Sequence, residues 1–427
     1  MFSNHRTVLR NSRLLSFGVL LLLLSSFVQG YAQRPKKGTF AENRSQRAPQ
    51  VRFQTGDRAL GIPFVTSSNL ILLQARVNDS SPLWFILDTG ADSTVIDVQL
   101  AKLLRLKSYR KMIGTGAAGT AEGVIYKSVN LRFSNVEALN RTVVALPLDS
   151  LSPHLGVKIS GVIGNDIIKE TVVEVDYASQ IINLYDPKAY RYSGTGTVIP
   201  ITIDENLPFV RTRAAFEGQT IEGKFELDSG STGAVLFNTP FVQKHKLLTA
   251  VPETNQTRMG GVGGTELAYV GRIKRILLGS ITIENPVARF SQGERGDNAS
   301  DRYDGRIGGE IFRRFKSIFD YFRKRIILEN NAPVTESYEV DMSGLELVGD
   351  GDDYSIVLVD DVEAGSVAAK AGIQGGDIIT AIGDRPASAF TLDQVRQMFM
   401  KDGREYLLTL RRGQNIVQAK LKLKRLI

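Results

Sequence analysis

Residues 85–90 read FILDTG and residues 225–230 read FELDSG, so that Asp88 and Asp228 stand 140 positions apart. In both stretches an apolar run ends in an aspartate followed by a hydroxyl residue and a glycine. An apolar run that ends in such residues predicts a buried strand followed by a turn. One motif of this kind is a weak signal, because Asp and Gly favour turns, but two copies after apolar strands are a strong one.

A second matched pair follows these motifs. Residues 161–168 read GVIGNDII and residues 305–312 read GRIGGEIF, 144 positions apart. Both copies then continue to an Asp-Tyr pair, at 176–177 and 320–321. Self-similarity at a nearly fixed separation indicates a duplicated unit. The sequence therefore predicts two tandem copies of a mainly β unit of about 140 residues each.

This order of motifs resembles the aspartic peptidases of the pepsin and retropepsin type, over residues 60–330. The duplication resembles the bilobal pepsin-like chains, whereas residues 88–94, DTGADST, look more like the retropepsin form. The resemblance implies a mainly β fold, with one peptidase lobe over residues 59–193 and a second over residues 194–332. It also implies that an extended polypeptide is the substrate.

The resemblance implies that Asp88 and Asp228 are the catalytic residues. Two carboxyl groups about 3 Å apart cannot both ionise, so one keeps a proton while the other accepts a proton from a water molecule. Thr89 and Ser229 would then hydrogen-bond across the lobe interface. The alternative is that both aspartates merely cap turns, although each follows an apolar strand that would bury its carboxylate.

The glycines that end the two motifs support the same site. Gly90 and Gly230 would leave backbone N–H groups open to the carboxylates, where a Cβ would crowd them. In many pepsin-like enzymes the residue after each glycine is Ser or Thr. Lobe two keeps this pattern with Ser231, whereas lobe one has Ala91. The loss of one hydroxyl donor should raise the pKa values of the aspartate pair.

Arg306 is a second departure, because it replaces the apolar residue expected before Ile307 and Gly308. An arginine that points outward is compatible with the pattern. An arginine that points inward would disturb the packing under Asp228.

Two glycine-rich segments lie between the matched motifs, at residues 114–119 and 260–264. The first also spells Gly-x-Gly-x-x-Gly, the dinucleotide-binding pattern, but the residues after it read as strand, and that pattern requires a helix there. A flexible flap over a cleft is favoured over a plain hairpin tip. The predicted flap residues are Gly114, Gly116, Gly119, Gly261 and Gly263.

Residues 340–427 form a third unit, in which residues 366–379 read SVAAKAGIQGGDII. This stretch resembles the helix-turn-strand signature of PDZ domains, particularly those attached to bacterial proteases, which implies a β sandwich or barrel with two helices. A peptide tail would add a strand beside a helix over residues 392–400. The implied carboxylate-binding loop is Gly344, Leu345, Glu346 and Leu347, in which Glu346 replaces the usual glycine. The alternative is a packing module that binds no peptide.

The N-terminal 58 residues carry all of the formal charge of +8, so the remainder is neutral and suggests no nucleic-acid-binding face. Residues 1–32 have a basic start, an apolar run and small residues before position 33, which predicts a cleaved secretory signal peptide. An uncleaved membrane anchor is the alternative, although the run is short for a span. Residues 33–58 predict a basic disordered tether or, alternatively, a short inhibitory prosegment.

The composition excludes several other chemistries. The chain has no cysteine and only three histidines, none in a His-Glu-x-x-His pattern, and no Gly-x-Ser-x-Gly elbow. Disulfide scaffolds, thiol proteases and zinc peptidases are therefore excluded, and no metal or cofactor is expected. We expect a secreted or periplasmic monomeric endopeptidase. The alternatives are a non-catalytic peptide-binding scaffold acting through the PDZ unit, and lobes that act as half-sites in a dimer.

Overall fold

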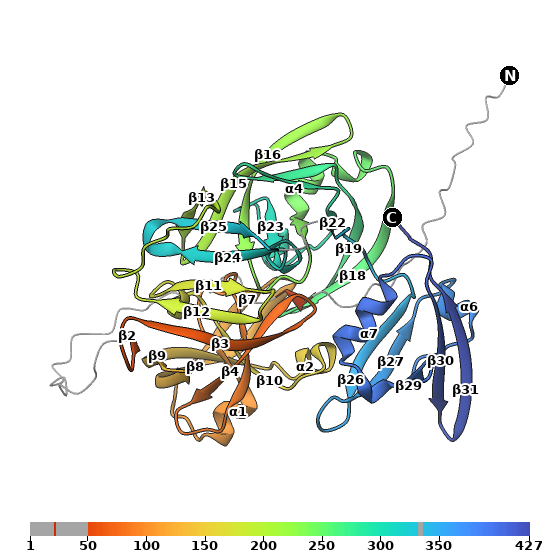
Figure 1. Ribbon diagram of the computed structural model, residues 1–427, viewed down its shortest axis with the longest axis horizontal. Helices are drawn as coiled ribbons and strands as arrows, with labels where there is room; N and C mark the ends of the chain where they lie inside the picture. The colour runs from red at the N-terminus through yellow and green to blue at the C-terminus, as the bar shows by residue number, and fades with distance from the viewer. Residues whose placement is uncertain (1–20, 23–49, 332–335) are drawn as a thin grey trace.

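The computed structural model describes residues 21–22, 50–331 and 336–427, and Figure 1 shows a mainly β chain with two stacked lobes and a C-terminal unit beside them. The mainly β prediction is confirmed. The predicted signal peptide and tether fall almost wholly outside the described residues. The tether prediction is wrong at its end, because residues 50–53 form a strand on lobe one and a second strand begins at Arg58.

Lobe one contains two strands that enclose the first aspartate motif and two long hairpin strands. Its elements are β2 (Gln50–Phe53), β3 (Arg58–Ser67), β4 (Leu70–Val77), β5 (Leu83–Leu87), β6 (Val95–Asp97), α1 (Val98–Leu103), β7 (Ser108–Gly116), β8 (Gly119–Phe133), β9 (Val136–Leu146), α2 (Leu151–Leu155), β10 (Ile159–Ile163), α3 (Asn165–Ile168), β11 (Val172–Asp176) and β12 (Ile181–Tyr185).

Lobe two repeats this order. Its elements are β13 (Thr197–Pro200), β14 (Thr202–Asp204), β15 (Leu207–Phe216), β16 (Gln219–Asp228), β17 (Val235–Phe237), α4 (Thr239–Lys244), η1 (Leu247–Thr249), β18 (Thr254–Gly261), β19 (Gly264–Arg272), β20 (Arg275–Leu278), β21 (Ile281–Glu284), β22 (Val287–Ser291), η2 (Asp297–Ala299), β23 (Gly305–Gly308), α5 (Gly309–Phe312), β24 (Phe315–Asp320), η3 (Tyr321–Arg323) and β25 (Arg325–Asn330). The short strand β1 (Leu21–Leu22) pairs in parallel with the end of β18.

The same three-strand arrangement surrounds each aspartate motif. In lobe one β10 lies between β5, to which it is parallel, and β6, to which it is antiparallel. In lobe two β23 lies in the same way between β16 and β17. The central strand of each arrangement is buried along its whole length, which fixes the backbone beside which each aspartate projects.

The two lobes share one sheet and one core. Strand β11 of lobe one pairs with β24 of lobe two in antiparallel register, with Val173 opposite Phe319. Both side chains belong to a single apolar cluster that extends through the two lobes. The aspartate motifs are therefore held by a continuous core and not by two domains that move freely.

The C-terminal unit has its own sheet and its own apolar core. Its elements are β26 (Leu345–Asp350), β27 (Ile356–Val362), α6 (Val367–Lys370), β28 (Ile378–Ile382), β29 (Arg385–Pro386), η4 (Ala387–Ala389), α7 (Leu392–Phe399), β30 (Glu405–Arg412) and β31 (Asn415–Lys422). The core lies under α7, where Val395 and Phe399 are fully buried. Strand β26 forms one edge of this sheet and β31 the other.

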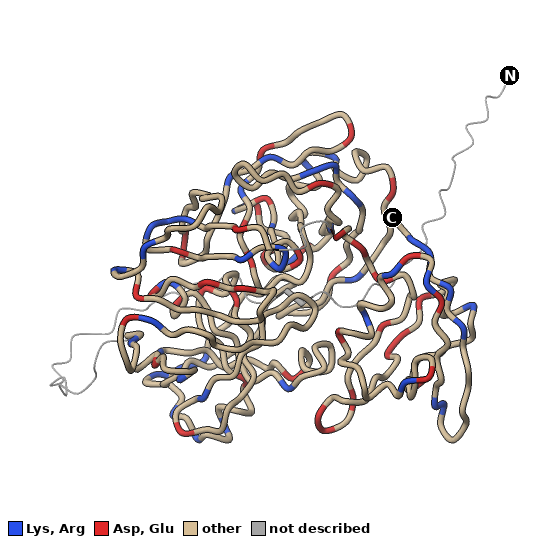
Figure 2. Tube along the Cα trace, in the orientation of Figure 1, with Lys and Arg blue, Asp and Glu red and all other residues tan. Residues whose placement is uncertain are grey.

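Acidic and basic residues are interspersed along the described chain. Figure 2 shows Lys and Arg interleaved with Asp and Glu on both lobes and on the C-terminal unit. Within the residues that the structure describes, no helix has the length and apolar character needed to cross a membrane.

Candidate active site

The structure brings Asp88 and Asp228 together at the interface of the lobes. Asp88 directly follows β5 and Asp228 is the last residue of β16, so the two carboxyl groups come from matching strand ends. Their side chains are 0% and 1% exposed. The two carboxyl groups are close enough to share a hydrogen bond, and neither can be ionised without affecting the other.

Backbone N–H groups and close packing hold the pair. Gly90 donates its N–H to Asp88 Oδ1 at 2.7 Å, and Gly230 donates to Asp228 Oδ1 at 2.8 Å. A Cβ at Gly90 would lie 2.4 Å from Asp228 Oδ1, and one at Gly230 would lie 2.3 Å from Asp88 Cγ. Each glycine therefore makes room for the carboxyl group of the opposite lobe, and any side chain at either position would push the aspartates apart.

The hydroxyl residues of the two motifs bond across the interface, as the sequence predicted. Thr89 Oγ1 accepts the N–H of Ser229 at 2.9 Å and donates to the carbonyl of Leu227 at 2.7 Å. Ser229 Oγ accepts the N–H of Thr89 at 3.0 Å and donates to the carbonyl of Leu87 at 3.0 Å. These four reciprocal hydrogen bonds fix the two loops relative to each other.

The burial of the pair changes its protonation. Burial, and then the charge of Asp228, raises the pKa of Asp88 well above its ordinary value. Burial also raises the pKa of Asp228, but the guanidinium of Arg306 acts in the opposite direction. The pair therefore holds a proton at a pH at which exposed aspartates are fully ionised.

Arg306 points inward, which corrects the expectation that it could face outward. Its side chain is 0% exposed, and its Nε lies 3.0 Å from Glu226 Oε2 and 3.3 Å from Asp228 Oδ2. The same guanidinium donates to Asn298 Oδ1 and to the hydroxyl of Tyr303. The packing under Asp228 is thus polar and well hydrogen-bonded, so an inward arginine does not leave a buried charge unpaired.

Glu226 is a site residue that the sequence analysis missed. It is fully buried two positions before Asp228, on the same strand and face. A signal was present in the repeat, because the matching residue of lobe one is the apolar Ile86. Glu226 and Arg306 each stand at a position that is apolar in lobe one. Because the two positions are cross-strand neighbours, an acid at one and a base at the other predict a buried ion pair.

The predicted flap residues lie on two hairpins. Gly114, Gly116 and Gly119 belong to the β7–β8 hairpin, called flap one here, whose tip is residues 117–118. Gly261 and Gly263 belong to the β18–β19 hairpin, called flap two, whose tip is residues 262–263.

The two tips touch, backbone against backbone. A Cβ at Gly116 would lie 2.2 Å from the carbonyl oxygen of Val262, and one at Gly119 would lie 2.6 Å from that of Gly263. Each tip also packs into the opposite lobe. Val262 joins an apolar cluster of lobe one that contains Ala91, and Ala117 joins a cluster with residues of lobe two. The two flap tips are therefore closed against each other.

The predicted carboxylate-binding loop of the C-terminal unit is the start of β26. Gly344 has a positive φ of 73°, and a Cβ there would lie 2.2 Å from Ser366 Cβ. Leu345 and Leu347 are buried, whereas Glu346 is half-buried. The N–H of Leu345 already donates to Ser343 Oγ at 3.0 Å, so this donor is not available to a ligand in the present conformation.

The groove between β26 and α7 faces lobe one. Arg396 of α7 donates to the carbonyl oxygens of Leu347 and His154, each at 2.6 Å, and to Ser68 Oγ at 3.0 Å. Asp393 of the same helix accepts the N–H of Ser68 at 2.7 Å. The carbonyl of Leu347 belongs to the edge strand β26 and is a backbone group that an added strand would use. Because Arg396 already binds this carbonyl and that of His154, Arg396 and lobe one occupy the groove.

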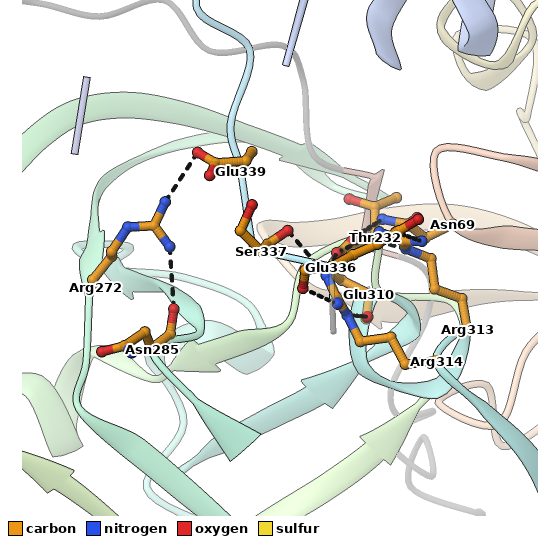
Figure 3. Close-up of polar contacts among 10 residues, drawn as sticks. All are labelled: Asn69, Thr232, Arg272, Asn285, Glu310, Arg313, Arg314, Glu336, Ser337 and Glu339. Atoms are coloured by element: carbon orange, nitrogen blue, oxygen red, sulfur yellow. Dashed lines mark hydrogen bonds and ion pairs between the residues drawn. The ribbon is translucent and has the colours of Figure 1, made fainter. Parts of the chain in front are cut away.

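The Ser68–Asn69 turn, which meets α7, also contacts the loop that follows Asp228 in lobe two. Asn69 Nδ2 donates to the carbonyl of Thr232 at 2.8 Å and to Glu310 Oε2 at 2.7 Å (Figure 3). Figure 3 also shows the segment before β26 held on lobe two, where Glu336 accepts from Arg313 and Arg314 and Glu339 accepts from Arg272. The C-terminal unit is therefore attached to both lobes.

No cluster of His, Asp or Glu side chains among the described residues has the arrangement that a metal ion needs. The arrangement at Asp88 and Asp228 instead suits proton transfer between two carboxyl groups and a bound water molecule.

Comparisons with known families agree with two parts of the chain. The model of the aspartyl protease family matches residues 73–167, and a PDZ domain model matches residues 358–412. No match was found among curated proteins. The predicted architecture of a peptidase followed by a PDZ domain is thereby confirmed. The first match contains Asp88, whereas Asp228 lies outside both, so the assignment of lobe two rests on the internal repeat and on the reciprocal hydrogen bonds.

Proposed function

We propose that this chain is an aspartic endopeptidase in which Asp88 and Asp228 activate a water molecule. The observation that carries the proposal is the pair of buried carboxyl groups at matching strand ends, fixed by the hydrogen bonds of Thr89 and Ser229. A merely turn-capping aspartate does not need a partner from the other lobe. The aspartyl protease match over lobe one supports the same reaction class.

The reaction follows from one shared proton. The ionised carboxylate takes a proton from water while the water oxygen attacks the carbonyl carbon of the peptide bond. The protonated carboxyl donates its proton to the carbonyl oxygen, which gives a neutral gem-diol. The diol then returns one hydroxyl proton to the ionised carboxylate, the other carboxyl group donates the proton that it took from water to the amide nitrogen, and the C–N bond breaks. No proton is gained or lost overall, and the pair is restored.

The substrate is an extended polypeptide that lies between the aspartates and the two flaps. Strand β7 stands at one end of its sheet and carries backbone groups that can pair with an added chain. Because the flap tips touch across the site, binding first separates them.

The C-terminal unit recruits peptide tails in this proposal, and recruitment competes with its attachment to lobe one. A tail that adds to β26 displaces Arg396 from Leu347 and takes the place of the α2 segment. The Ser68–Asn69 turn contacts both α7 and Thr232. Release of α7 from this turn therefore also changes the support of the loop that follows Asp228 in lobe two.

We further propose that the protein acts outside the cytoplasm, in the periplasm or secreted, on the strength of its signal-peptide-like leader. One chain supplies both aspartates, so a monomer is sufficient for activity. Sedimentation of the protein distinguishes this from a dimer of half-sites.

A peptide-binding scaffold without turnover is the second candidate, and the ion pair between Arg306 and Asp228 favours it. The deciding experiment incubates the intact protein and its Asp88→Asn variant with an unbiased peptide pool over pH 3–8. Cleavage by the intact protein alone supports the peptidase. Tail binding by both proteins, with cleavage by neither, supports the scaffold.

A further inference from the structure

The two lobes differ at one pair of matched positions beside the aspartates. In lobe one the cross-strand neighbours at the end of β5 and in β10 are Ile86 and Val162, both fully buried. In lobe two the corresponding neighbours are Glu226 and Arg306, also fully buried. An apolar pair in one lobe is thus a charged pair in the other, and the environment of the aspartates is not symmetric.

The asymmetry reaches the atoms that exchange protons. Oδ2 of Asp228 lies 3.3 Å from the Nε of Arg306. Oδ2 of each aspartate is buried without a hydrogen-bond partner among the described residues, so the nearby guanidinium is what distinguishes the two. Each carboxylate accepts one backbone N–H, but only a negative charge at Asp228 is also stabilised by a cation within ion-pair distance among the described residues.

The position of Arg306 is fixed by its other partners. Asn298 and Tyr303 accept from its two terminal nitrogens, and Glu226 accepts from Nε. Burial opposes the charge of this guanidinium, but the facing groups outweigh burial and raise its pKa. Asn298 also donates its N–H to the carbonyl of Ala117 at the tip of flap one, so the arginine is linked to the closed flap.

We propose that Arg306 is a positioning residue that keeps the negative charge on Asp228 and leaves the shared proton on Asp88. Its catalytic consequence rests on the peptidase function proposed above. Asp228 is then the base that takes the proton of the attacking water, and Asp88 is the acid that donates to the carbonyl oxygen. Glu226 is the counter-ion that holds Arg306 within reach of Asp228.

The sign of the effect follows from the charges that face this cluster. A cation beside Asp228 lowers the pH at which the pair loses its first proton, and an anion raises it. The titratable and charged groups that face Asp228 or Arg306 are Asp88, Glu226, Glu266, Asp297, Tyr303 and Tyr321. Arg306 is the only cation among these groups. Its removal should therefore move the acid limb of the kcat/KM profile to higher pH.

The test compares variants of the full chain, each first shown to be folded by circular dichroism and its Tm, because Glu226→Leu alone removes one partner of a buried ion pair. Replacing a buried ion pair by apolar residues of similar volume is often neutral for stability. The Glu226→Leu variant keeps Arg306, and the Glu226→Leu, Arg306→Met variant removes it. We expect the acid limb of the double variant to lie at least roughly one pH unit above that of Glu226→Leu. A Glu226→Leu, Arg306→Lys variant keeps the cation and should recover most of the shift.

A second readout does not need activity. In Asp88→Asn and Asp228→Asn proteins with ¹³C-labelled aspartate carboxyls, the remaining site aspartate is titrated by NMR. Asp228 should ionise at lower pH than Asp88, and Arg306→Lys should preserve this order. Equal acid limbs in the Glu226→Leu variant and the Glu226→Leu, Arg306→Met variant would overturn the proposal, as would the reverse NMR order. The expected NMR order in a protein that cleaves no peptide refutes the peptidase function and leaves the role of Arg306 standing.

Discussion

Thr89 and Ser229 each accept the other's backbone N–H on a side-chain oxygen, and each hydroxyl donates to a carbonyl of the opposite lobe. All of these groups are buried. The two residues act as a clamp that cannot lose one hydroxyl without leaving buried backbone groups unpaired.

The first prediction tests this clamp. Thr89→Val removes the acceptor for Ser229 N–H and the donor to Leu227, so the free energy of unfolding should fall by about 1–3 kcal/mol for each unpaired group. Thr89→Ser is the matched control, since it keeps the hydroxyl. Urea denaturation of both variants checks the result, and equal stability of the two would contradict the clamp.

The second prediction concerns the aspartates. Asp88→Asn and Asp228→Asn should each reduce cleavage by at least ~10²–10⁴-fold, the usual contribution of an acid–base group. Because the folded-state pKa of each aspartate is raised, the folded protein loses stability as pH rises from the ordinary aspartate range toward the raised value. Both variants should therefore gain stability relative to the native protein as pH rises. Near-native cleavage by either variant removes that residue from the mechanism.

The third prediction is an activity optimum in mild acid, at roughly pH 4–6.5, because the bell-shaped profile reports the two pKa values of the pair. Ala91→Ser should move the acid limb to lower pH by supplying a hydroxyl donor near Asp88, whose Oδ2 has none among the described groups. Ser231→Ala at the matching position of lobe two is the control, with no shift expected, because Ser231 lowers the pKa of Asp228 through its backbone N–H, which alanine keeps. Profiles of kcat/KM that coincide for all three proteins would show that position 91 does not set protonation.

The fourth prediction concerns the closed groove. Arg396→Met removes hydrogen bonds to Ser68, His154 and Leu347, so binding of C-terminal peptides should tighten, with a lower Kd in fluorescence anisotropy. Arg411→Met, an exposed arginine of the same unit, is the control and should leave Kd unchanged. If neither protein binds any tail, the unit serves attachment and not recruitment.

The fifth prediction uses a buried acid of the C-terminal unit. Burial, and then Asp341, raises the pKa of Glu363 to about 8, and its Oε2 has no hydrogen-bond partner among the described residues. Folding stability from this group is present below its ordinary pKa of 4.5 and is lost as pH rises toward 8. Glu363→Gln should therefore raise Tm increasingly between pH 5 and pH 8. A constant difference in Tm across that range would contradict the raised pKa.

The repeat made the central site predictable from sequence. Asp88, Asp228 and their hydroxyl and glycine neighbours are local motifs, and their meeting follows from the duplicated strand order. The orientation of the Arg306 side chain could not be predicted, because the apolar pattern of the repeat indicates only which residue type is usual at that position. Its inward orientation depends on Glu226, which is distant in sequence and adjacent only after β16 and β23 have paired.

The attachment of the C-terminal unit could not be predicted for a different reason. It depends on Arg396 meeting carbonyl groups of α2 and β26, and no periodicity marks which surfaces face each other. The end of the tether was misplaced because β2 has only four residues, QVRF, and so short an alternation of polar and apolar residues does not stand out from the polar segment before it.

The crossed flap tips add an opening free energy to every binding event. Val262 of flap two packs in lobe one, and Ala117 of flap one packs against lobe two. One tip therefore cannot move away without breaking contacts of the other. Opening is then a single cooperative step, and only the small open population binds substrate. The apparent Kd equals the intrinsic Kd divided by that population, so a weaker tip contact tightens apparent affinity without touching the substrate. Selectivity among polypeptides then depends partly on which chains bind strongly enough to offset the free energy of opening.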